Sequence, residues 1–164
     1  MLLHIYDSSD WTIRLTAPQR DADRKVPIDD GNNFYSALDA LVQEGKMYDR
    51  ILFETHGAPG RIGFGKVDID ADYLGSLATR SYTIFVAQNA RVYFNGCNVA
   101  EGKPGWDFLE AAAKVFLTPG GGQVFGQTAA GFANPFNDHV VHLWGSTKTL
   151  YVDNTGRIVE RFEQ

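Results

Sequence analysis

Two apolar segments of the sequence end on residues that can do chemistry. The segment ILFETHG ends on His56 and Gly57, and the segment RVYFNGC ends on Cys97, the one cysteine of the chain. A thiol is a weak nucleophile while it is protonated. A neighbouring imidazole shifts it toward the thiolate and can return the proton to a leaving amine. Brought together, Cys97 and His56 would form the pair that cysteine amidohydrolases use.

The backbone around these two residues offers a second catalytic feature. Glycine has no side chain to obstruct its amide, so the N–H groups of Gly57 and Cys97 can point at a developing oxyanion. Loss of one such donor typically costs about 3 kcal/mol of transition-state stabilisation. We therefore expect the oxyanion hole at these two amides.

Hydrophobic periodicity predicts the elements that must position this pair. Short apolar runs indicate strands, and apolar residues at helical spacing indicate helices. The expected strands are 2–6, 50–54, 91–95 and 123–127, and the expected helices are 34–42, 70–78 and 108–116. The segment 11–31 contains Pro18, Pro27 and the charged run RDADRK, and it predicts a long loop.

The order of these elements predicts an α/β fold. Alternating strands and helices form a mostly parallel sheet flanked by helices in three layers, and the strand RILFE lacks the polar alternation of a strand with one face in water. The segment GRIGFGKVDI suggests a small hairpin, and the tail around 154–156 suggests an antiparallel hairpin at one edge of the sheet. In such sheets, sites lie beyond the carboxyl ends of neighbouring strands, where His56 and Cys97 fall.

Length and composition narrow the function classes. A chain of 164 residues is the size of one domain, 1–164, and its net charge of −5 with scattered Lys and Arg gives no basic stripe for nucleic acid. Its apolar runs are too short for a membrane span, and no export signal is evident, so we expect a cytoplasmic protein or export by a signal-less route. The glycines fit no phosphate-binding motif, and we expect no cofactor. The sequence sets no oligomeric state.

The motifs also resemble a known class. An apolar strand ending in His-Gly, followed by one ending in Gly-Cys, resembles the caspase-fold cysteine peptidases. The segments THGAPGRIGFG and YFNGCNVAEGKPGWDFLEAAAKVF are similar to an uncharacterised bacterial caspase-like domain family, often found at the head of large surface or secreted proteins. The resemblance covers about 48–128. It implies a caspase-like fold and a cysteine endopeptidase that acts on a polypeptide.

The resemblance also implies roles for individual residues. It makes Cys97 the nucleophile, His56 the general acid/base, and the Gly57 and Cys97 amides the oxyanion hole. Asn95 stands where many of these peptidases have Gln or an acid, and we expect it to contact substrate. Near the end of the first strand, where caspases use a basic residue to bind an acidic side chain, this sequence has Asp7, Asp10 and Arg14, so the preferred substrate residue does not follow from the resemblance. An acidic pocket at Asp7 would favour Lys or Arg in the substrate.

Other interpretations stay open. A lone cysteine at a strand end is usually a small buried hydrophobic residue, which would make the domain a catalytically silent binding module of the same fold. A secreted effector or toxin of this fold is a further alternative. His139 and His142 have a spacing that suits a metal on a helix, but HVVHLW reads as a strand, where the two side chains face opposite ways, and we expect no metal. Asp138 beside His139 could act only if the tail covered the crevice.

Overall fold

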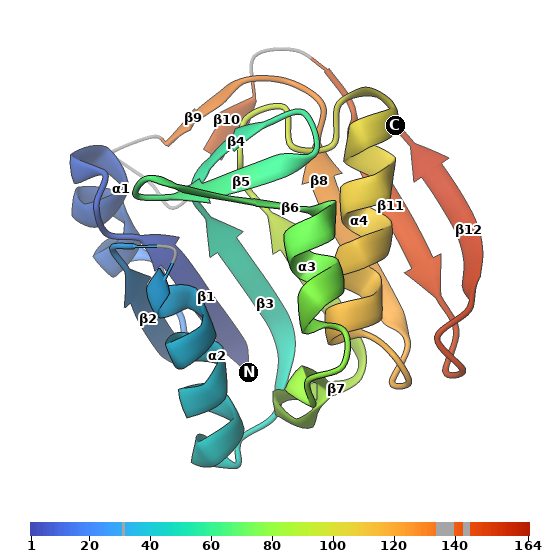
Figure 1. Ribbon diagram of the computed structural model, residues 1–164. Coiled ribbons are helices and arrows are strands. Elements are labelled where there is room, and N and C mark those ends of the chain that lie inside the picture. Colours follow the sequence, from blue (N-terminus) through green and yellow to red (C-terminus); the bar gives the residue numbers. More distant parts are fainter. Residues whose placement is uncertain (31, 134–139, 143–144) are drawn as a thin grey trace.

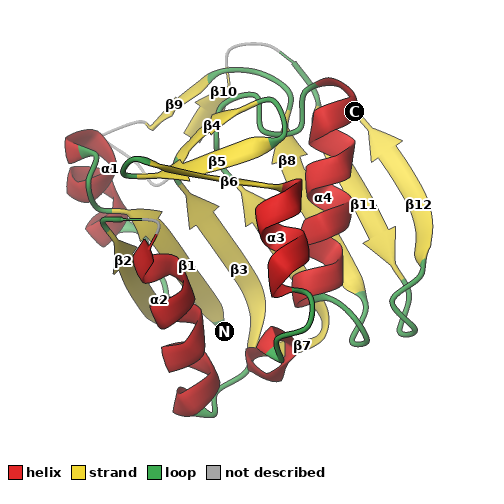
Figure 2. Ribbon diagram, viewed as in Figure 1, coloured by secondary structure: helices red, strands yellow, loops and turns green. Residues whose placement is uncertain are grey.

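The computed structural model describes residues 1–30, 32–133, 140–142 and 145–164. Within these residues, seven strands form one sheet in the order β12-β11-β8-β7-β3-β1-β2 (Figures 1 and 2). The strands are β1 (Leu2–Asp7), β2 (Arg24–Ile28), β3 (Tyr48–Glu54), β7 (Val86–Phe94), β8 (Gly122–Gln127), β11 (Thr147–Val152) and β12 (Ile158–Glu163). Strands β2, β1, β3, β7 and β8 are parallel neighbours. Strand β11 joins β8 antiparallel, and β12 joins β11 as a hairpin at the sheet edge, as the sequence predicts.

One face of the sheet carries the larger helical layer. Figure 1 shows α2 (Asn32–Glu44), α3 (Ala71–Leu77) and α4 (Gly102–Phe116) in front of the strands. Alternate residues of β3 and β7 point into this layer, where Phe53 and Phe94 stack with ring centroids 4.8 Å apart. Phe108 and Phe116 of α4 contact these two rings. The interleaved aromatic side chains bury the apolar stripe of each helix, which is the main source of helix stability in a packed domain.

The opposite face has a thinner cover. In a right-handed crossover, the direction of the step along the sheet decides which face the connecting helix covers. Helices in steps of opposite direction therefore cover opposite faces of the sheet. The step from β1 to β2 is the reverse one, and it contains α1 (Trp11–Thr16) and the 3₁₀ turn η1 (Ala17–Gln19). Arg20, directly after η1, contacts Glu54 on the face of β3 opposite Phe53. The predicted three layers are present, with unequal thickness.

This thin cover corrects one expectation about β3. The sequence predicts a strand covered on both faces, whereas the structure buries Ile51 and Phe53 and leaves Leu52 partly exposed and Arg50 exposed. Arg50 lies at the amino-terminal end of the strand, beyond the reach of α1. The apolar run therefore indicated the central position of the strand in the sheet and not its full burial.

The predicted loop over 11–31 is wrong. It contains α1, η1 and the edge strand β2. Helix α1 begins after Asp10, whose carboxylate accepts hydrogen bonds from the amides of Thr12 and Ile13, both at 2.9 Å. Pro27 lies within β2, which pairs on one side with β1 and can therefore hold a residue that lacks an N–H. A helix of six residues and a strand interrupted by proline are too short to produce a clear periodic pattern.

A small second sheet stands over the carboxyl end of β3. Strands β4 (His56–Ala58), β5 (Arg61–Phe64) and β6 (Val67–Asp70) form an antiparallel sheet, which includes the hairpin predicted from GRIGFGKVDI. The Thr55 hydroxyl donates a hydrogen bond to the Gly63 carbonyl, and Ile62, Phe64 and Ile69 are buried in the common core. His56 therefore begins a strand that is held to β5 by the ladder and by the Thr55 side chain. Within the described ranges, no helix is long and apolar enough to cross a bilayer.

Candidate functional site

Neighbouring strands bring the two sequence motifs to one corner of the sheet. Strands β3 and β7 pair in parallel with Phe53 opposite Phe94, so the segments that follow them start side by side. The Asn95 amide donates a hydrogen bond of 2.8 Å to the Phe53 carbonyl and extends the ladder by one step. His56 and Cys97 each lie three residues beyond the Phe53–Phe94 pair.

The two motifs are in direct backbone contact. A Cβ atom at Gly57 would lie 2.6 Å from the Cys97 carbonyl oxygen and 2.8 Å from the Gly96 carbonyl carbon. A Cβ atom at Gly96 would lie 3.0 Å from the Gly57 Cα. A side chain at Gly57 would therefore push the two segments apart, and the approach depends on glycine. The oxyanion role of the Gly57 and Cys97 amides stays a prediction.

The loop after β7 holds Cys97 at the surface of this corner. Cys97 is partly exposed and is not a member of the hydrophobic core. The amide of Asn98 donates to the Ala129 carbonyl at 3.1 Å, and the Ala100 amide donates to the Gln127 carbonyl at 2.9 Å. These bonds fasten the residues that follow Cys97 to the end of β8 and the segment after it.

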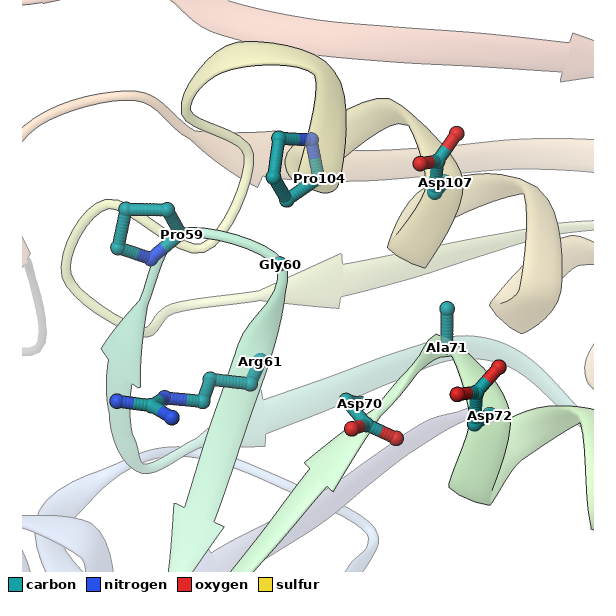
Figure 3. A pocket seen from close by; sticks show the side chains of 8 residues that line it. All are labelled: Pro59, Gly60, Arg61, Asp70, Ala71, Asp72, Pro104 and Asp107. Carbon is teal, nitrogen blue, oxygen red and sulfur yellow. The ribbon is translucent and has the colours of Figure 1, made fainter.

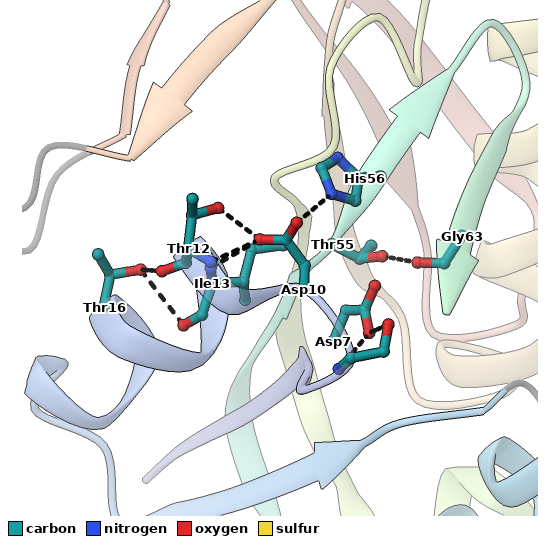
Figure 4. A network of polar contacts seen from close by, with 9 residues as sticks. Asp7, Asp10, Thr12, Ile13, Thr16, Thr55, His56 and Gly63 are labelled. Carbon is teal, nitrogen blue, oxygen red and sulfur yellow. Dashed lines mark hydrogen bonds and ion pairs between the residues drawn. The ribbon is translucent and has the colours of Figure 1, made fainter. Parts of the chain in front are cut away.

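His56 is exposed and faces a carboxylate from another element. Its side chain is 65 % exposed, and its Nε2 lies 3.0 Å from Asp10 Oδ2 (Figure 4). The other oxygen of Asp10 accepts the amides of Thr12 and Ile13 and the Thr12 hydroxyl, so each carboxylate oxygen has its own partners. The N-cap of α1 thus holds Asp10 in place against the imidazole.

The electrostatics of Asp10 agree with this geometry. Partial burial acts to raise its pKa, but the Thr12 and Ile13 hydrogen bonds and the contact with His56 outweigh that effect and hold the pKa well below its ordinary value of 3.8. Asp10 is therefore an anion at neutral pH. It can accept a hydrogen bond from the Nε2–H of a neutral imidazole and stabilise an imidazolium.

Sequence reasoning missed this role of Asp10. It grouped Asp10 with the acidic residues near the first strand and did not connect it to His56. A local signal was present, because Asp followed by WTIRLT is typical of an N-cap with a short helix after it. The contact with His56 joins segments far apart in the chain, and it depends on α1 lying over the carboxyl ends of β1 and β3.

The two residues predicted to bind substrate lie in different surroundings. Asp7 is 2 % exposed, and one of its oxygens accepts both the amide and the hydroxyl of Ser9, at 2.9 and 2.6 Å. Its carboxylate is thereby engaged in its own turn (Figure 4). Asn95 is partly exposed and lines a pocket of about 240 Å³ together with side chains of β7, β8 and β11. Substrate binding at either residue stays a prediction.

A buried charged cluster supports the strand that leads to His56. The Arg20 guanidinium donates to both oxygens of Glu54, at 2.6 and 2.7 Å, and His4 Nε2 lies 2.9 Å from Glu54 Oε2. Burial acts to raise the pKa of Glu54, but Arg20 and His4 outweigh it and lower the pKa to about 2. The cluster joins β1 and β3 to Arg20, which follows α1 and η1. Asp10 lies at the start of the same crossover, as the N-cap of α1.

Two further pockets lie near this corner. One, of about 130 Å³, is lined by His56, Gly57 and residues of β5 and β6. The other, of about 360 Å³, lies between the β4–β5 turn, the start of α3 and the start of α4 (Figure 3). Two of its three acidic residues have structural partners, since Asp70 accepts the Tyr73 amide as the N-cap of α3 and Asp107 pairs with Lys103. We assign no chemistry to this larger pocket.

The described part of the chain holds no group of three or more His, Cys, Asp or Glu residues arranged to bind a metal ion. His139 and its neighbour Asp138 lie outside the described residues. The expectations about the His139–His142 spacing and about Asp138 therefore stay predictions.

Comparison with known proteins places this corner in a family. A family model described as a domain of unknown function, DUF4347, matches residues 10–118 of the 164 residues. The chain belongs to the DUF4347 family. The match begins at Asp10 and includes His56 and Cys97, whereas Asp7 and the residues of β8 and β11 at this corner lie outside it. Comparisons with curated proteins and with solved structures found no match.

Proposed function

We propose that this DUF4347 domain is a cysteine endopeptidase or amide hydrolase that uses Cys97 and His56 on a polypeptide substrate. The observation that carries the proposal is the backbone contact of Gly57 with Gly96 and Cys97, which brings the segments of the exposed His56 and the partly exposed Cys97 to one sheet corner. The resemblance of the His-Gly and Gly-Cys motifs to the caspase-fold peptidases supports it independently.

The proposed reaction has two steps. His56 accepts the thiol proton, and the Cys97 thiolate attacks the substrate carbonyl to form a tetrahedral oxyanion beside the Gly57 and Cys97 amides. The carbon–nitrogen bond then breaks as the imidazolium gives its proton to the leaving amine, which leaves a thioester on Cys97. In the second step His56 accepts a proton from water as the water attacks the thioester, and the acid product and the thiol are restored.

Asp10 serves in this scheme as a positioning residue that acts through His56. When the Nε2–H of the imidazole donates a hydrogen bond to the Asp10 carboxylate, Nδ1 is the ring nitrogen that remains to exchange a proton with the Cys97 sulfur or the leaving amine. The fixed carboxylate also stabilises the imidazolium that forms during the reaction. Since the hydrogen bonds of α1 hold Asp10, the short helix becomes part of the proposed active site.

The rate of Cys97 alkylation against pH tests the proposal. Iodoacetamide should modify Cys97 at about pH 6.5 at least roughly tenfold faster in the intact protein than in the His56→Ala variant, because a thiol without an activating base reacts readily only near pH 8.5. Digestion of a peptide library, read by mass spectrometry, should reveal cleavage at defined positions. Equal alkylation in both proteins together with an undigested library would instead support the silent binding module.

The Asp10→Asn variant should lose catalysis and keep its fold. Asparagine caps a helix about as well as aspartate, so the melting temperature should change little. It cannot supply a negative charge to the imidazolium, and we expect the rate constant for cleavage to fall by about 10²-fold or more with little change in KM. Steady-state kinetics measure both quantities. A loss confined to KM, or a rate equal to that of the parent protein, would contradict the positioning role.

A further inference from the structure

The pocket beside Asn95 has a composition that sets it apart from the rest of the corner. It lies at the carboxyl ends of β7 and β8 and at the start of β11. Tyr93 and Asn95 alternate with Phe94, whose ring contacts Phe108 of α4, so these two side chains lie on the sheet face away from that helix. Phe125 pairs with Tyr93 in the strand register and shares this face.

Apolar and neutral polar groups form the lining. The rings of Tyr93 and Phe125 stack with centroids 4.5 Å apart and an interplanar angle of 8°. The Thr147 hydroxyl donates to the Gln127 side-chain oxygen at 3.2 Å. No Asp, Glu, Lys or Arg is present among the described residues that line the pocket, which are Tyr93, Phe94, Asn95, Phe125, Gly126, Gln127 and Thr147.

The size of the pocket limits what it can hold. Pockets for whole small molecules have volumes of roughly 300–1,000 Å³. The pocket at Asn95 measures about 240 Å³, which suits one side chain of a larger ligand. Asn95 precedes Cys97 by two residues, so the pocket adjoins the loop that carries the proposed nucleophile.

We infer that this pocket binds an uncharged aromatic or branched aliphatic side chain of the substrate, next to the bond that Cys97 cleaves. The inference rests on the proposed function, because the cleaved bond is defined by Cys97 as the nucleophile. The stacked rings offer an apolar wall, and the amides of Asn95 and Gln127 can bond to the substrate backbone or to a tyrosine hydroxyl. A carboxylate or ammonium group would lose water there without gaining an opposite charge. This preference for neutral side chains differs from the preference for Lys or Arg that an acidic pocket at Asp7 would give.

Titration of N-acetyl amino-acid amides into ¹⁵N-labelled Cys97→Ala protein tests this inference without requiring catalysis. The amides of phenylalanine, tyrosine and leucine should shift the resonances of Asn95 and Gln127, with affinities about tenfold or more above those of the aspartate and lysine amides. Thr147→Phe, made in the same background, should fill the pocket and remove these shifts. Thr155→Phe, at the far end of β11 in the exposed turn before β12, is the matched control and should leave them unchanged.

The outcomes separate this inference from the proposed function. Equal or stronger binding of the aspartate or lysine amides, no shift with any amide, or full binding in Thr147→Phe would overturn the assignment of the pocket. If the library digestion shows cleavage but the titration shows no neutral preference, the proposed function stands and this inference fails. If the titration shows the preference and Cys97 proves unreactive, the pocket stands as a peptide-binding site and the catalytic proposal fails.

Discussion

The Cys97→Ala variant is expected to lose peptide cleavage by roughly 10³-fold or more, because removal of a covalent nucleophile eliminates the acyl-enzyme route altogether. The fold should persist. Cys97 is partly exposed, and alanine keeps the backbone that contacts Gly57, so the free energy of unfolding should change by about 1 kcal/mol or less. Library digestion and urea denaturation measure the two effects separately.

Ser76→Ala provides the control for a small polar side chain removed elsewhere. Ser76 is exposed on α3, and its hydroxyl donates to the Tyr73 carbonyl within the same helix. This variant should cleave at the parental rate. Parental activity in Cys97→Ala would exclude Cys97 as the nucleophile, even if His56 proved essential.

The Glu54→Ala variant is expected to show the largest loss of stability. The substitution removes the carboxylate that binds two nitrogens of Arg20, a residue that is 8 % exposed. Removal of one partner of a buried ion pair typically costs about 3–5 kcal/mol of stability. Glu44→Ala is a matched control, because Glu44 also binds an arginine through two nitrogens, Nε and Nη2 of Arg24, but at a more exposed place. Its cost should be at most about 1 kcal/mol. Equal denaturation midpoints for the two variants would contradict the importance of the buried cluster.

The same carboxylate predicts a pH dependence of stability. The pKa of Glu54 is about 2 in the folded protein and 4.5 for the free side chain, so the folded state favours the anion. Its contribution, roughly 3 kcal/mol, is fully present above pH 4.5 and is lost as the pH falls from there toward 2. Urea unfolding across this range should show parental stability falling toward that of Glu54→Ala, whose own stability should fall less.

The sheet and its larger helical layer were predictable because their signals are local. The apolar runs at 50–54 and 91–95 and the helical spacing of 34–42 and 108–116 each report burial within a few residues of sequence. The prediction that the carboxyl ends of β3 and β7 are close also followed, since the parallel order of the strands leaves few topologies.

The rest depended on contacts that no short window contains. Helix α1 and strand β2 are too short for periodicity, and α1 is held by its cap and by the strand beneath it. The contact between Asp10 and His56 exists because the β1–β2 crossover passes behind the sheet. The pocket at Asn95 requires the registers of β7, β8 and β11 together, because its lining comes from strands that the sequence does not align.

The close fit of Gly57 against Gly96 also constrains how this domain can evolve. The two glycines lie far apart in the sequence, yet their backbones are in contact at the sheet corner. A side chain at Gly57 would displace the segment that carries Gly96 and Cys97, whereas a Cβ atom at Gly96 would require its neighbours to shift by only a few tenths of an ångström. Lineages that keep the chemistry should therefore keep Gly57, and they should replace Gly96 by alanine more readily.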